Sequence, residues 1–126
     1  MKTELLLDNF ELAISRLDQA LATPAASDLI RAGCIQYFEF CFELAWKSVK
    51  RLAEQAGQLD CLSPKAALKT AFANRWIDNE ETWLDMLASR NLMSHTYSAA
   101  DALTIYQRLP AYLPEFKVLM EALHRA

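Results

Sequence analysis

The sequence predicts an all-α protein, an antiparallel up-and-down four-helix bundle with an additional short helix. Three observations point to this fold class. The 126 residues include only 2 glycines and 4 prolines, too few for the many turns of an all-β protein. Apolar residues recur every three to four positions, which is the spacing of one helix face. Hydrophobic residues make up 53% of the chain, as in globular proteins, and its length suits one core, so we expect a single domain over residues 1–126.

Two long helices are predicted in the first half of the chain. The first runs from about Thr3 to Ala22 and ends before Pro24, since a proline disfavours helix at the residue that precedes it. The second runs from about Ser27 to Gln55, capped by Ser27 or Asp28 and stopped by Gly57. A continuous apolar stripe runs along this helix from Ile30 to Leu52, and three aromatic residues lie outside it: Phe40, Phe42 and Trp46. This helix is therefore expected to be buried on several sides or to lie at a subunit interface.

The second half of the chain predicts one short helix and two further helical regions. Ser63-Pro64 is a helix start signal, and the short helix runs from there to about Asn74. Asp78 or Asn79 opens the fourth helix, which carries the segment SRNLMSHTY at residues 89–97. The last helical region starts near Ala99, and its two prolines, Pro110 and Pro114, are expected to kink or split it.

Polar side chains crowd the end of the fourth helix. With 100° per residue, Asn91 and His95 continue a predicted apolar stripe made of Leu84, Leu87 and Ala88. An adjoining stripe groups Trp83, Met86, Arg90 and, if the helix persists that far, Tyr97, with Ser94 close in angle to Arg90. Polar groups that face inward need partners, so the cluster is a candidate site.

Each of these residues also has a structural interpretation. Arg90 could pair with a bundle carboxylate such as Glu39 or Glu43, and Asn91 could satisfy the backbone of a neighbouring helix. His95 could be a helix-end residue, and Tyr97 could be a core ring with a solvated hydroxyl. Taken singly, each residue fits such a role, whereas the whole group is costly to keep in a bundle for packing alone.

An arginine and a histidine without metal ligands suit one reaction in particular. The guanidinium matches phosphate oxygens, and the imidazole moves protons near neutral pH. Together they suit RNA cleavage by the RNA's own 2′-hydroxyl, with His95 as general base or acid and Arg90 stabilising the phosphorane. One arginine and one histidine are few groups for a catalytic site, and a two-fold dimer would bring two copies of each together.

Composition limits the other classes of function. The net charge is −3 and the pI about 5.3, so the broad basic surface of a general nucleic-acid-binding protein is not expected. A small local basic site is compatible with this net charge. We expect Cys34, Cys41 and Cys61 to be buried structural thiols, and neither a metal site nor a cofactor is expected. The chain shows no signal peptide and no apolar run long enough for a membrane span, which predicts a cytoplasmic protein.

The segment at the end of the fourth helix resembles a known signature. Arg90 and His95 form an R-x4-H motif, typical of HEPN domains, which are small all-α nucleases and nuclease relatives. Extended through Tyr97, the motif reads R-x4-H-x-Y and resembles the HEPN toxins that are encoded beside a minimal nucleotidyltransferase (MNT) antitoxin. Three blocks are similar to the nucleotidyltransferase substrate-binding protein branch: FELAWKSVKRLAEQAG at 42–57, SPKAALKTAFANRWI at 63–77 and WLDMLASRNLMSHTY at 83–97.

The resemblance implies a helical bundle that dimerises through the faces carrying the motif. It implies that Arg90 and His95 are the ribonuclease residues, that Asn91 and Ser94 support them, and that the partner enzyme silences the nuclease by transferring AMP to Tyr97. Two alternatives remain open. The chain could be a non-catalytic partner that binds a nucleotide or substrate for a minimal nucleotidyltransferase, or a bundle that only dimerises.

Overall fold

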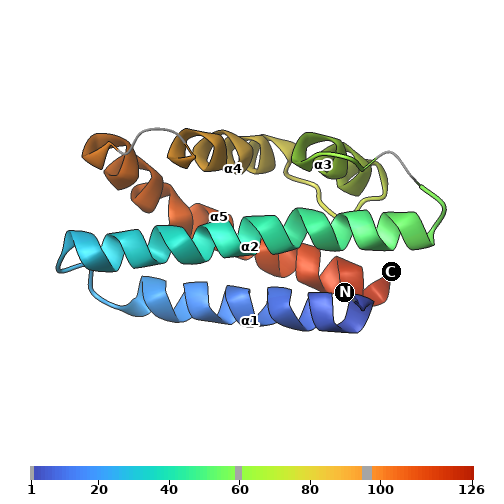
Figure 1. Cartoon of the computed structure of the whole chain (residues 1–126), viewed down its shortest axis with the longest axis horizontal. Helices are drawn as coiled ribbons and strands as arrows, with labels where there is room; N and C mark the ends of the chain where they lie inside the picture. Colours follow the sequence, from blue (N-terminus) through green and yellow to red (C-terminus); the bar gives the residue numbers. More distant parts are fainter. Residues whose placement is uncertain (1, 59–60, 95–97) are drawn as a thin grey trace.

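The computed structural model describes residues 2–58, 61–94 and 98–126, and within these ranges the regular structure is entirely helical. In chain order the helices are α1 (Thr3–Ala22), α2 (Asp28–Gln55), α3 (Pro64–Ala73), α4 (Glu80–Met93) and α5 (Ala99–Arg125). Figure 1 shows α1 and α2 side by side, with the shorter α3 and α4 in a layer on the other side of α2. The predicted all-α bundle with one additional short helix is confirmed.

Side-chain caps begin the helices α2 to α5. The hydroxyl or amide oxygens of Ser27, Ser63, Asn79 and Ser98 accept hydrogen bonds from the backbone N–H three residues on. Such caps satisfy donors that the first helical turn leaves without a partner. At the end of α2, Gly57 has φ of 81°, and the Gln58 N–H donates to the Ala53 carbonyl at 2.8 Å. This closing turn needs a left-handed residue, which explains the glycine.

Helix α2 lies at the centre of the fold and contacts all four other helices. Its buried side includes Phe38 and Phe42, both fully inaccessible, whereas Phe40 is 48% exposed. Of the two predicted alternatives, burial on several sides is the one that these helix contacts support. Aromatic edges join the layers, since the Trp83 and Phe116 ring centroids lie 5.5 Å apart at an interplanar angle of 88°.

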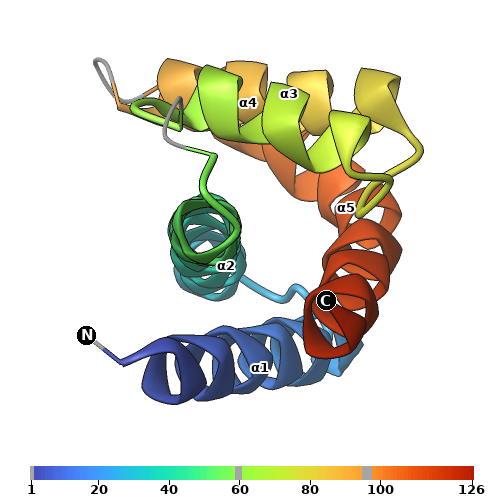
Figure 2. The same cartoon turned by 90° about the vertical axis from the view of Figure 1, so that its right-hand side faces the viewer.

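Helix α5 links the two layers. It is continuous through Pro110 and Pro114, so of the two predicted alternatives, a kink or a split, the split is wrong. Figure 2 shows it bending from the level of α4 down to the level of α1. Because proline removes one helical hydrogen bond, it permits such a bend. The buried Leu109, Tyr112 and Phe116 hold the helix together on both sides of the prolines.

One prediction about α4 is wrong. Its buried residues are Trp83, Met86 and Ser89, whereas Leu84 is 42% exposed and Asn91 is exposed. Most of the stripe that carries Asn91 therefore faces outward, and only Leu87, which is half-buried, packs against the core. Both faces of this helix carry apolar side chains, and burial of the large Trp83 ring against Phe116 selects the other one.

Candidate functional site

A partly buried hydrogen-bonded chain fixes the part of α4 that carries the candidate site. The Tyr112 hydroxyl of α5 donates to Asp85 Oδ2 at 2.5 Å and lies 2.8 Å from Ser89 Oγ. Ser89 is only 1% exposed. Burial first, and then the hydrogen bond to Asp85, raises the pKa of Tyr112, so the phenol stays protonated. Because Ser89 directly precedes Arg90, this contact also sets the direction in which Arg90 leaves the helix.

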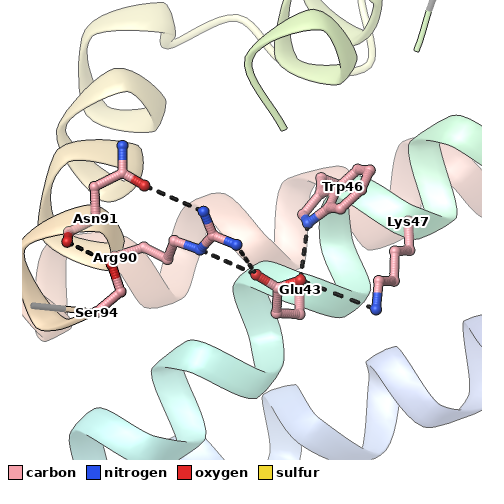
Figure 3. Close-up of polar contacts among 6 residues, drawn as sticks. All are labelled: Glu43, Trp46, Lys47, Arg90, Asn91 and Ser94. Atoms are coloured by element: carbon pink, nitrogen blue, oxygen red, sulfur yellow. Dashed lines mark hydrogen bonds and ion pairs between the residues drawn. The ribbon is translucent and has the colours of Figure 1, made fainter. Parts of the chain in front are cut away.

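Arg90 reaches across to α2 and is held by Glu43 (Figure 3). Its Nε and Nη2 both donate to Glu43 Oε1, at 3.1 and 2.8 Å, and each side chain is 33% exposed. The second carboxylate oxygen, Oε2, accepts from Trp46 Nε1 at 3.0 Å and lies 4.0 Å from Lys47 Nζ. Of the two carboxylates named as examples of a partner, the structure pairs Arg90 with Glu43, which also lies at ion-pair distance from Lys47, four residues further along α2.

The guanidinium keeps hydrogen-bonding capacity beyond this ion pair. Its Nη1 donates to Asn91 Oδ1 at 3.1 Å, and Ser94 Oγ donates to the Asn91 carbonyl at 2.7 Å. A guanidinium carries five N–H groups, and three are engaged by the described residues. With respect to this part of the chain, each terminal nitrogen keeps one N–H, and such a pair of donors fits two oxygens of a phosphate.

A second carboxylate, Glu39, lies near Arg90 without pairing with it directly. Burial raises the pKa of Glu39, while the charge of Arg90 lowers it and the charge of Glu43 raises it. A cavity of about 240 Å³ opens between these side chains, lined by Gln36, Glu39, Phe40, Glu43, Arg90 and Ser94. The Arg90 fork therefore lies at an accessible hollow between α2 and α4 rather than on a flat surface.

A larger cavity of about 530 Å³ adjoins the first one and shares Gln36 and Glu39 with it. Its other walls come from the start of α2, from Met93 and from the first turns of α5. This volume falls in the range of small-molecule sites.

The predicted site residues fall into two groups. Arg90, Asn91 and Ser94 come together at the end of α4, in contact with one another and with α2. His95 and Tyr97 lie outside the described residues. Helix α4 ends at Met93 with Ser94 as its C-cap, and the predicted alignment of Tyr97 with Arg90, which depended on a longer helix, concerns a residue outside the described ranges.

Sequence reasoning missed the parts of the site that α2 contributes. Gln36 and the exposed ring of Phe40 line the cavity, and Trp46 orients Glu43. The one available signal was the row of polar residues at helical spacing on α2, which reads equally well as a solvated face.

The three cysteines belong to the core. Cys34, Cys41 and Cys61 are free and buried, as predicted, and burial raises the pKa of Cys41 to about 12. Over the described ranges, His, Cys, Asp and Glu form no group of three that could hold a metal ion. No helix in the described part of the chain is long and apolar enough to cross a membrane.

Fold and site together define a small helical-bundle protein in which an arginine lies between two helices, α2 and α4. The sequence matches the family described as "Nucleotidyltransferase substrate binding protein like" over residues 5–125, and the chain belongs to this family.

Relatives and solved structures agree with this assignment. A protein of Haemophilus influenzae named "Probable ribonuclease HepT" is 31% identical over 102 residues, which span 78% of this chain and 70% of that protein. The H. influenzae protein HI0074, whose structure is described as revealing the fold of a substrate-binding domain of a nucleotidyltransferase, is 28% identical. It superposes with a TM-score of 0.83 over 94% of this chain and 98% of its own. A crystal structure from Thermus thermophilus is 29% identical, with a TM-score of 0.81 over 90% of this chain and 98% of its own.

Proposed function

We propose that the protein is a HEPN-type toxin, a metal-independent ribonuclease of a toxin–antitoxin pair, built as a single domain over residues 1–126. The observation that carries this proposal is the geometry of Arg90. Glu43 fixes its guanidinium on one side, while one N–H of each terminal nitrogen has no acceptor among the described residues and is available to a phosphate. The name of the H. influenzae relative supports the same activity.

In the proposed reaction the RNA supplies its own nucleophile. A general base removes the proton of a 2′-hydroxyl, its oxygen attacks the neighbouring phosphorus, and the 5′-oxygen leaves with a proton from a general acid. The products are a 2′,3′-cyclic phosphate and a 5′-hydroxyl. His95 takes the proton-transfer role and Arg90 stabilises the added charge of the phosphorane. Asn91 and Ser94 support the site by holding Arg90 and the end of α4.

A homodimer would place two such sites together, so that one His95 serves as base and its copy as acid. The outward face of α4 supports this proposal, because Leu84, Ala88 and Leu92 recur there every four residues and all three are exposed. Light scattering should give twice the monomer mass, and Leu92→Glu should reduce it to that of a monomer. A wild-type monomer at micromolar concentration would contradict the dimer.

The proposed partner is a minimal nucleotidyltransferase that silences the nuclease by transferring AMP to Tyr97. The family description and the description of HI0074 support a nucleotidyltransferase as partner. An added AMP would bring bulk and negative charge to a residue two positions from His95, where it would compete with RNA for Arg90.

A specific observation also favours a second candidate function, a non-catalytic subunit that binds a nucleotide or substrate for a nucleotidyltransferase. The cavity of about 530 Å³ beside the site is large enough for a nucleotide, and its shared Gln36 and Glu39 offer hydrogen bonds to a base.

A ribonuclease assay in EDTA separates the two functions. Purified wild type, Arg90→Ala and His95→Ala are compared on total cellular RNA, with each protein checked for folding, mass and absence of AMP. Cleavage by the wild type alone is expected. No cleavage by folded, AMP-free wild type would refute the ribonuclease and favour the binding subunit.

A further inference from the structure

A cationic groove lies beside the site, between the start of α1 and the second half of α2. Its cavity of about 330 Å³ is lined by Leu6, Trp46, Lys47, Lys50, Arg51 and Glu54. Three of these six side chains are cations and one is an anion. On a chain with a net charge of −3, this local excess of positive charge is unusual.

The three cations are only weakly neutralised. Lys47 lies 4.0 Å from Glu43 and Lys50 lies 4.0 Å from Glu54, both at the outer limit of an ion pair. Arg51 forms no ion pair with any of the described residues. The groove therefore retains positive charge that an anionic ligand would meet.

The groove adjoins the Arg90 site through the contact between Trp46 and Glu43. One carboxylate oxygen of Glu43 accepts hydrogen bonds from Arg90, and the other accepts one from Trp46. Trp46 also lines the groove. Figure 3 shows Arg90 on one side of Glu43, with Trp46 and Lys47 on the other. From Lys47 to Arg51 the helix advances about 6 Å, which is comparable with the spacing of successive phosphates in an extended strand.

We propose that this groove binds the ribose-phosphate backbone of RNA next to the phosphate held by Arg90; the proposal rests on the ribonuclease function proposed above. Lys47, Lys50 and Arg51 would contact about two phosphates, and the Trp46 ring offers an apolar surface to the sugar or base between them. An acidic protein surface fits the geometry less well, because the cations follow one helix in a line that ends at the reactive centre.

The test measures binding with cleavage switched off. A short labelled single-stranded RNA of mixed sequence is titrated with His95→Ala protein at several salt concentrations. The groove variant adds Lys50→Gln and Arg51→Gln to the His95→Ala protein. Lys47 is kept, because it lies beside Glu43 and its loss would disturb the Arg90 site. The matched control is Lys117→Gln/Arg125→Gln, which removes a lysine and an arginine from α5, a helix that contributes nothing to the groove. Thermal unfolding confirms that every variant is folded.

The groove variant should bind RNA about tenfold more weakly at low salt, and its salt slope should fall by about 1 to 1.5, since each lost single-strand phosphate contact contributes about 0.7. The control should match the His95→Ala parent.

Three results would overturn the groove. Equal RNA binding by the groove variant and its parent would refute it while leaving the ribonuclease in place. Unchanged RNA binding with lost binding to the neighbouring nucleotidyltransferase would reassign the groove to a protein partner. No RNA binding by the parent at any salt concentration would remove the ribonuclease proposal, and the groove proposal with it.

Discussion

Replacing Glu43 tests whether the Arg90 guanidinium is held as the structure shows. In Glu43→Gln the side chain keeps its shape but has one acceptor oxygen in place of two. That oxygen cannot serve Arg90 and Trp46 at once, so one donor loses its acceptor, and the amide N–H₂ then faces a donor.

The size of the effect follows from the exposure of the pair. Exposed ion pairs contribute at most about 1 kcal/mol, and hydrogen bonds to charged groups about 1.5–3 kcal/mol. Both side chains are 33% exposed, which places this pair between the two cases. We expect Glu43→Gln to lower the free energy of unfolding by about 1 kcal/mol and the Tm by about 3–5 °C. Asp18→Asn is the control, because the Asp18–Lys117 pair is at least half exposed and should contribute less than about 0.5 kcal/mol.

Activity should follow the same series. Without the ion pair to Glu43, the Arg90 side chain samples other rotamers, so its two remaining N–H groups are no longer oriented toward the phosphate. We expect Glu43→Ala to lower the cleavage rate about tenfold, Glu43→Gln to lower it less, and Arg90→Ala to abolish it.

Two results would refute this reasoning. If both Glu43 variants unfold at the wild-type temperature, within the change seen for Asp18→Asn, the ion pair does not persist in solution. If Glu43→Ala is destabilised but cleaves RNA at the wild-type rate, Glu43 stabilises the fold without positioning Arg90.

Three further predictions concern other parts of the molecule. Tyr112→Phe should lower the free energy of unfolding by about 2 kcal/mol in a denaturant titration, because it removes a bond to Asp85 and leaves the buried Ser89 hydroxyl without its partner; a loss below about 0.5 kcal/mol would mean that water replaces both contacts. The free energy of unfolding should fall as the pH rises above the ordinary pKa of a cysteine, which is 9.0. The reason is that the folded state keeps the Cys41 proton up to a pKa of about 12, while the unfolded chain releases it earlier. Cys41→Ala should show a smaller fall over the same pH range. Incubation with the partner nucleotidyltransferase and ATP should add the mass of AMP to the wild type and not to Tyr97→Phe, and addition to both would assign the AMP to another residue.

The helices themselves were predictable from the sequence because their signals are local. Ser63-Pro64 starts α3 and Gly57 closes α2 through contacts with residues fewer than six positions away. The first helix, Thr3–Ala22, has the predicted bounds. The sequence also suggested a bundle carboxylate such as Glu39 or Glu43 as the partner of Arg90, and the structure pairs it with Glu43.

What only the tertiary structure decided is which helix faces which. Periodicity gives the angle of each residue around its own axis, but it does not say which neighbour covers that angle. On α4 two faces were apolar enough to be buried, and packing of Trp83 against Phe116 chose the one that turns Asn91 outward. The same limit applies to the groove, since it exists only where Leu6 of α1 lies beside Lys50 and its neighbours on α2. The sequence thus determined the helices and the residues able to do chemistry, while the packing of one helix against another determined which of those residues meet.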